Sequence, residues 1–121
     1  MQKFLVGMCY HEPEAWALHQ RGIIEDFESS TGLFVEAPTP QEAAMWGEAV
    51  ACELLRYANN DSSLDWAALG YTCWIETDPQ SSGWAHCLPF FQCVRVGEMP
   101  DLTQMDTPAY TKWATAHGIK Y

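Results

Sequence analysis

The sequence has few basic residues, and this scarcity limits the classes of partner. It contains 6 Lys and Arg against 16 Asp and Glu, which gives a formal net charge of −10 at pH 7. Between Gly22 and Val94 the only basic residue is Arg56. A field of this sign repels nucleic acid and anionic membranes, and it attracts basic proteins. We therefore expect no direct nucleic-acid ligand and no membrane surface.

Other signatures are missing as well. The 8 glycines are never spaced as G-x-G-x-x-G or G-x-x-x-x-G-K, so no glycine-rich loop of the nucleotide-binding kind is found. No apolar run approaches the roughly 20 residues of a membrane-spanning helix. The apolar segment after Lys3 is too short for a signal peptide. We therefore expect a cytoplasmic protein without a cofactor.

The cysteines do not form a disulfide pattern. Their number is odd, and their spacings match no known framework, so we expect reduced and mostly buried thiols. They are Cys9, Cys52, Cys73, Cys87 and Cys93. No cysteine lies at a predicted helix N-terminus, where a thiolate would be stabilised, so a thiol nucleophile is not indicated.

A structural zinc site is an alternative use of these thiols. Its ligands would be Cys9, His11, Cys87 and Cys93. Zn²⁺ takes four such ligands in tetrahedral geometry. The paired CxxC or HxxxH spacing that makes the signal specific is absent, so buried cysteines are the favoured interpretation.

What the sequence does contain is enough apolar material for one folded domain. Hydrophobic residues make up 48% of the 121 residues and charged residues 18%, which is typical of a globular chain. There are 6 Trp, 5 Tyr and 5 Phe. We expect the core to be rich in rings, with a minority of them exposed to a partner.

The periodicity predicts an α+β fold. Residues 3–10 alternate as a central strand with the Phe4 side toward the core, and 23–27 and 33–37 resemble a hairpin. Thr39-Pro40-Gln41-Glu42 predicts a capping box that opens a helix over about 40–57, in which Gly47 indicates close approach to a sheet. We expect an antiparallel sheet of four or five strands, with this helix and a C-terminal helix packed on one face.

The remaining segments are less regular. Residues 12–22 suit a short helix, although the alternation of Trp16 and Leu18 would equally suit a strand. A short helix is predicted over 62–70, a strand over 71–76, and a final helix from Thr107 to Gly118. Residues 84–96 are apolar enough for a long strand, which Pro89 would interrupt at an edge or a bulge. The long helix also carries a second apolar face at Met45, Ala49 and Cys52, which predicts a covering element or a partner.

Three functional interpretations stay open. The first is binding to a basic protein, as an inhibitor or as an immunity or anti-defence protein for a nucleic-acid-handling partner. The residues that would bind this partner are Glu25, Asp26, Glu28 and Glu36. A homodimer is also possible. The second is a small-molecule site or enzyme between the sheet and the long helix, lined by Trp46, Trp74 and His86. The third is the zinc site. No catalytic grouping is found, so an enzyme is not the expected class.

Overall fold

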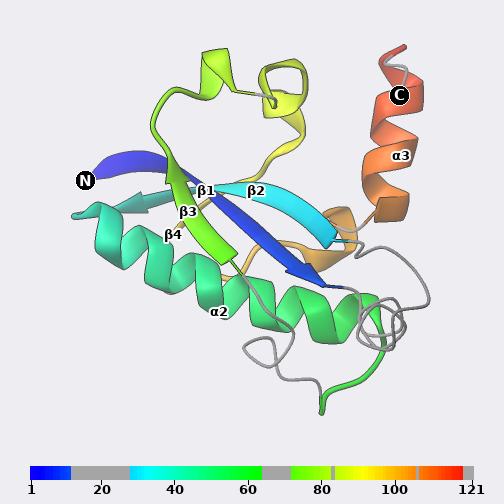
Figure 1. Ribbon diagram of the computed structural model, residues 1–121, viewed down its shortest axis with the longest axis horizontal. Helices are drawn as coiled ribbons and strands as arrows, with labels where there is room; N and C mark the ends of the chain where they lie inside the picture. The colour runs from blue at the N-terminus through cyan, green and yellow to red at the C-terminus, as the bar shows by residue number, and fades with distance from the viewer. Residues whose placement is uncertain (12–27, 64–71, 83, 106, 119–121) are drawn as a thin grey trace, which may run out of the picture.

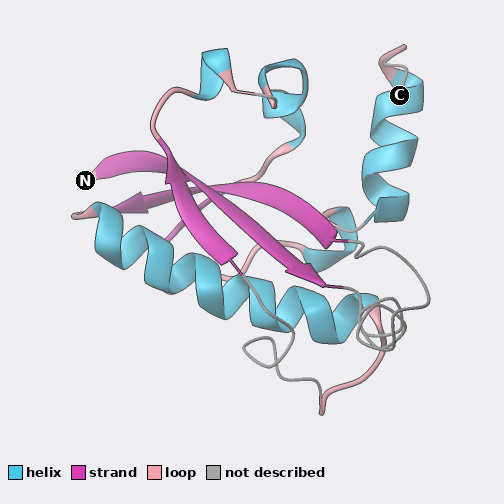
Figure 2. Cartoon of the chain, viewed as in Figure 1, coloured by secondary structure: helices cyan, strands magenta, loops and turns pink. Residues whose placement is uncertain are grey.

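The computed structural model describes residues 1–11, 28–63, 72–82, 84–105 and 107–118. The strands are β1 (Gln2–His11), β2 (Glu28–Ala37), β3 (Thr72–Glu76) and β4 (Cys93–Arg95). The α-helices are α2 (Pro40–Ala58) and α3 (Thr107–Ala116). Short 3₁₀ helices are η2 (Pro79–Ser81), η3 (Ala85–Phe90) and η4 (Leu102–Gln104) (Figures 1 and 2). The predicted α+β fold is therefore confirmed.

The strands form a four-stranded sheet in the order β3-β1-β2-β4. β1 is central, as predicted, and pairs antiparallel with both β2 and β3. β4 pairs with β2 in parallel, with Phe34 opposite Cys93 and Glu36 opposite Arg95. The prediction of an antiparallel sheet is therefore wrong. A parallel pair needs a long crossover, and residues 38–92, which include α2 and β3, provide it.

Helix α2 covers one face of the sheet. Both the start of this helix and its packing against β1 agree with the sequence pattern. The backbone N–H of Glu42 donates to the Thr39 hydroxyl at 3.2 Å, which satisfies one of the free donors at the helix start. Gly47 lies so close to β1 that an added Cβ would overlap Cγ1 of Val6. The predicted close approach of the helix to the sheet is confirmed.

The core lies between α2 and the sheet. The apolar side of β1 and β2 meets the inner side of α2 there, and the buried residues of this cluster are all 0–5% exposed. They are Val6, Met8, Leu33, Val35, Ala37, Ala43, Val50, Ala51, Leu54, Leu55 and Met105. Because these side chains are so well buried, this layer is a packed core.

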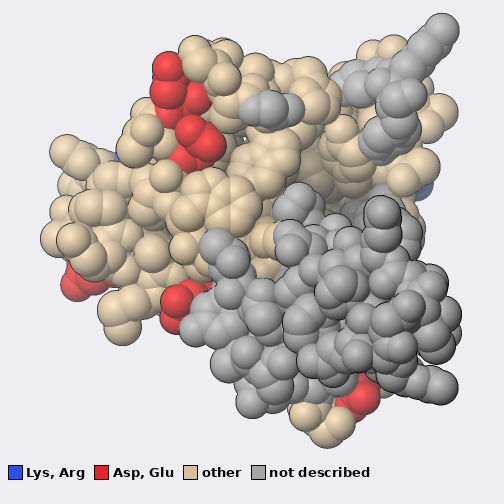
Figure 3. Space-filling view, in the orientation of Figure 1, with Lys and Arg blue, Asp and Glu red and all other residues tan. Residues whose placement is uncertain are grey.

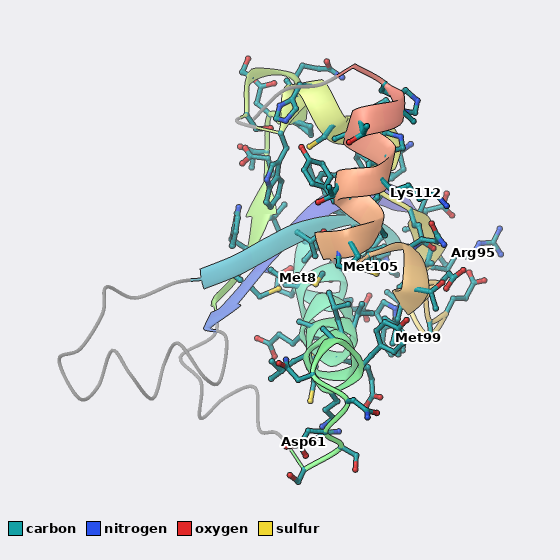
Figure 4. All side chains as sticks on the ribbon, turned by 90° about the vertical axis from the view of Figure 1, so that its right-hand side faces the viewer. Met8, Asp61, Arg95, Met99, Met105 and Lys112 are labelled. Carbon is teal, nitrogen blue, oxygen red and sulfur yellow. The ribbon has the colours of Figure 1, made fainter. Side chains whose placement is uncertain are left out.

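Helix α3 lies on the other side of the sheet. Its contacts are chiefly with η3 and η4, and Figure 4 shows it above the strands, with α2 and Asp61 below them. The prediction that both helices pack on one face is therefore wrong. The physical reason lies in the aromatic residues that follow β3. They make the second face of the sheet apolar, and an apolar face needs a covering layer of its own.

Two predicted β elements differ from the structure. Residues 28–32, predicted as a hairpin turn, belong to the continuous strand β2, which pairs with β1 along its whole length. Gly32 lies opposite Gly7 and is covered by Phe91. Residues 84–96 do not form a long strand. They form η3, which contains Pro89, and then the short strand β4.

Other predictions fall outside the described residues. These are the helix or strand over 12–22, the strand over 23–27 and most of the helix over 62–70. The predicted strand over 71–76 corresponds to β3, and the final helix ends before Gly118, whose φ of 69° suits glycine. Among the described residues, no helix combines the length and the apolar character needed to cross a membrane.

Candidate binding surfaces

The acidic residues predicted as a cluster are not brought together. Glu28 and Glu36 lie at opposite ends of the same strand, β2. At the usual rise of a strand, eight residues separate two Cα atoms by roughly 26 Å. Glu25 and Asp26 lie outside the described residues. Glu28 and Glu36 therefore do not share one site.

Glu36 also has a partner within the chain. Its carboxylate lies 3.4 Å from the guanidinium of Arg95 on the neighbouring strand β4. Both side chains are well exposed, and such pairs contribute about 0–1 kcal/mol to stability. The pair nevertheless reduces the charge that Glu36 offers to a binding partner.

The three residues predicted to line a pocket are distributed over both sides of the sheet. The indole N–H of Trp46, on α2, donates to the Glu98 carbonyl at 2.8 Å. Trp74 packs over Gly7 on the side away from α2, and the imidazole of His86 lies 3.3 Å from the Tyr110 hydroxyl. Trp46 is thus separated from the other two by the sheet.

The predicted metal ligands also lie apart. Cys9 pairs with Ser30 on β2, whereas Cys93 pairs with Phe34 of the same strand from its other edge. Cys87 is buried in η3. Within the described residues, no group of three or more His, Cys, Asp or Glu side chains could hold a metal ion.

Two of the thiols are held in their protonated form. Burial raises the pKa of Cys73 from 9.0 to about 11, with the nearby Glu48 carboxylate as a second cause. The Cys73 thiol donates to the Ala44 carbonyl at 3.6 Å. Burial also raises the pKa of Cys87. Neither thiol has the lowered pKa that a thiolate nucleophile requires.

The side of α2 that faces away from the sheet exposes an apolar stripe between carboxylates. We call Glu42, Met45, Glu48 and Ala49 the outer face of α2. Met45 is 69% exposed, and the other three residues are exposed as well. Neither carboxylate forms an ion pair within the described part of the chain. Cys52, the third member of the predicted stripe, is half-buried against the core.

The opposite side of the sheet is covered by a connected set of rings, which we call the aromatic cluster. Neighbouring rings in it have centroids 5.3–6.5 Å apart. Its members are Phe34, Trp74, Trp84, Phe90, Phe91, Tyr110 and Trp113. The Gly7–Gly32 pair makes room for it, because a Cβ at Gly32 would lie 2.8 Å from the Phe91 ring. The cluster fastens η3 and α3 to the sheet.

One edge of the aromatic cluster is hollowed. A space of about 160 Å³ is lined by Trp74, Glu76, Ser82 and Trp84, and we call it the tryptophan groove. The two indoles stack with centroids 5.7 Å apart and planes inclined by 24°. Figure 3 shows acidic side chains around the end of β3 and the loop that follows it, whereas Lys and Arg reach this view only at its margins.

A wider hollow of about 400 Å³ lies at the C-terminal end of α2, next to Tyr57 and Leu102. Its charged groups already have partners. Glu53 lies 3.3 Å from Arg56, and Asp61 accepts from the hydroxyl and the backbone N–H of Ser63, which together lower the pKa of its carboxyl. This hollow therefore offers less unsatisfied charge than the tryptophan groove.

Sequence reasoning identified one of these surfaces and missed the other. The stripe at Met45 and Ala49 follows from helical spacing. The pairing of Trp74 with Trp84 does not, because the two residues come from different elements. Comparison of the chain with protein-family models, with curated proteins and with solved structures finds no match.

Proposed function

We propose that the protein works by binding a basic protein, as an inhibitor of a nucleic-acid-handling protein would. The observation that carries the proposal is the outer face of α2. It combines an exposed apolar side chain, Met45, with two exposed carboxylates that have no cationic partner among the described residues. An apolar centre with a charged rim is the usual anatomy of a protein–protein interface.

Two forces would act on such a partner. Burial of a methionine side chain stabilises a complex by about 1.5–3 kcal/mol before the costs of association are subtracted. The carboxylates Glu42 and Glu48 act at longer range, because the net charge of −10 raises the encounter rate with a basic surface. The negative charge therefore raises the rate of association with a basic partner, and the apolar contact stabilises the complex once it has formed.

The sign of the charge also favours a different protein over a second copy of this one. A symmetric dimer through the outer face of α2 would bring the carboxylates of each copy toward those of the other. Like charges across an interface cost several kcal/mol. A basic surface instead neutralises Glu42 and Glu48 while it covers Met45.

A cytoplasmic location forms part of the proposal. None of the five cysteines is joined in a disulfide in the structure, and Cys93 is exposed. Free thiols persist in the reducing cytoplasm, whereas oxidising compartments favour disulfides.

The test compares substitutions that each raise the net charge by one unit. Met45→Lys and Glu48→Gln alter the outer face of α2, and Thr111→Lys places its charge on α3, on the other side of the sheet. A partner captured at low salt would be identified and its affinity measured for each variant. We expect Met45→Lys to weaken binding about ten- to a hundred-fold, given the loss of the methionine contact. Thr111→Lys should change the affinity by less than about two-fold.

Salt provides the second readout. The association rate of the wild-type protein should fall between 50 and 300 mM NaCl, because added ions screen attraction at roughly 8–10 Å. Equal affinities for Met45→Lys and Thr111→Lys would exclude the outer face of α2 as the binding surface. An association rate independent of salt would exclude the electrostatic part of the proposal.

A further inference from the structure

The tryptophan groove combines π-systems with a carboxylate that forms no ion pair with a Lys or Arg of the described residues. Trp74 is held between Gly7 and Trp84, and Trp84 is fixed in turn by Phe91, whose ring meets it at 82°. Glu76 follows Trp74 on β3 by two residues, so both side chains project from the same face of the sheet. The rings and the carboxylate therefore reach the groove from rigid positions.

Glu76 is available for an external cation. Its Oε1 accepts only a long contact of 3.5 Å from the backbone N–H of Asp78. No Lys, Arg or His of the described residues forms an ion pair with it. Ser82 shapes the rim, because its hydroxyl already donates to the Pro79 carbonyl at 2.7 Å and accepts from the backbone N–H of Trp84.

The chemistry of the lining selects the class of ligand. The negative faces of aromatic rings attract cations, and Glu76 adds a full negative charge, so an anion is disfavoured. A metal ion would find one carboxylate and no second charged ligand among the lining residues. An organic cation that can lie against a ring and donate hydrogen bonds satisfies both groups at once.

The arrangement of the indoles distinguishes between organic cations. Cages for methylated ammonium groups surround a spherical cation with rings. Here Trp74 and Trp84 are within 24° of parallel and stack on each other, so they form a wall rather than a box. Because Trp74 lies between Gly7 and Trp84, a planar guanidinium would pack flat against the outer indole, Trp84, and donate its N–H groups to the carboxylate at the rim.

We propose that the tryptophan groove binds the guanidinium group of an arginine side chain, packed against the indoles and paired with Glu76. The inference rests on the proposed function, because it takes the arginine to belong to a basic partner protein, at a second contact separate from the outer face of α2. The same aromatic cluster already holds one cation in this way, since the Lys3 ammonium lies 5.1 Å from the centroid of the Phe34 ring. The groove and the outer face of α2 lie on opposite sides of the sheet, so each can be tested without the other.

The experiment uses N-acetyl-L-argininamide as the probe and follows the indole N–H signals of the whole protein by ¹H–¹⁵N NMR. The signals of Trp74 and Trp84 should shift and saturate at millimolar probe. The signal of Trp46, which is bonded to the Glu98 carbonyl, should stay in place. N-acetyl-L-citrullinamide, the neutral analogue, should cause no saturable shift, and N-acetyl-L-lysinamide should bind more weakly than the arginine probe.

Two variants of equal charge separate this site from the proposed interface. Glu76→Gln should weaken binding of the arginine probe about ten-fold, as expected for the loss of one charge-assisted pair. Glu48→Gln should leave probe binding unchanged while it weakens binding of the partner protein. Equal effects of the two substitutions, or equal shifts with the citrulline analogue, would overturn the proposal. Saturable arginine binding alongside failed α2 tests would overturn only the proposed interface.

Discussion

At position 47 helix propensity and packing make opposite demands on one residue. Alanine is preferred to glycine inside a helix by about 1 kcal/mol. In this helix, however, a Cβ at Gly47 would overlap Cγ1 of Val6 and lie 3.2 Å from the sulfur of Cys73. Both neighbours belong to the sheet and have little freedom to move. Glycine here sets how closely α2 approaches β1.

We predict that Gly47→Ala lowers the free energy of unfolding by about 1–3 kcal/mol, because overpacking outweighs the gain in helix propensity. Urea unfolding monitored by circular dichroism measures this change. Val6→Ala removes the overlapping methyl groups, so adding it to Gly47→Ala should cost less than Val6→Ala costs in the wild-type protein. A Gly47→Ala variant as stable as the wild type would contradict the close contact between α2 and β1.

At the scale of elements, α3 depends on a few rings for its attachment. Phe90 of η3 contacts Tyr110 at 5.3 Å and Trp113 at 5.6 Å, measured between ring centroids. The His86 imidazole adds a hydrogen bond to Tyr110. Each ring pair contributes about 0.5–1.5 kcal/mol beyond the area it buries. Phe90 is therefore a main contact between α3 and the rest of the described chain.

We predict that Phe90→Ala releases α3 locally while the core remains folded. Hydrogen exchange of the α3 amides should accelerate by about ten-fold or more, which corresponds to roughly 1.4 kcal/mol of lost local stability. The amides of α2 should keep their protection, because α2 packs on the other side of the sheet. Tyr57→Ala, at a ring that is 44% exposed on α2, serves as the control. Unchanged exchange in α3 would show that other contacts hold it.

The elements that the sequence predicts are those with a local signature. Thr39 and Pro40 mark the start of α2, alternation marks β1, and the glycine at 118 follows the end of α3. Residues 28–32 have the composition of a turn, but β1 supplies a partner strand that overrides this local preference. The parallel pairing of β4 depends on a contact across residues 38–92, which no local pattern encodes.

The candidate sites divide in the same way. The outer face of α2 follows from the spacing of Met45 and Ala49 on one helix. The tryptophan groove requires η3 to return over β3, so only the folded chain brings Trp84 onto Trp74. The separation of Glu28 from Glu36 follows from the same cause, because a hairpin would have placed them near each other and a single strand does not.

At the scale of the whole molecule, the charge imbalance acts on stability as well as on binding. The described ion pairs, Glu53–Arg56 and Glu36–Arg95, are exposed and contribute little. The remaining carboxylates repel one another within a compact volume, and a net charge of −10 therefore destabilises the folded state. Added salt screens this repulsion more than it weakens the two pairs.

We predict that the urea midpoint rises between 10 and 200 mM NaCl, as the screening length falls from about 30 Å to below 10 Å. The slope of unfolding with urea should not change, because salt leaves the exposed area of both states as it is. Thr111→Lys, which reduces the net negative charge by one unit, should show a smaller rise. A midpoint that falls with salt would mean that the ion pairs outweigh the repulsion.

The short strand β4 has a further consequence for the time before the protein is folded. It pairs with residues 34–36 at the outer edge of β2, and this pairing closes residues 38–92 into a loop, at an entropic cost of about 3.5 kcal/mol. Until then β2 presents a row of free backbone donors and acceptors to other chains in the same state. Pairing of Cys93–Arg95 with β2 thus comes late in folding and lowers the risk of misassembly through this edge. The other strands of the sheet pair with one another without β4.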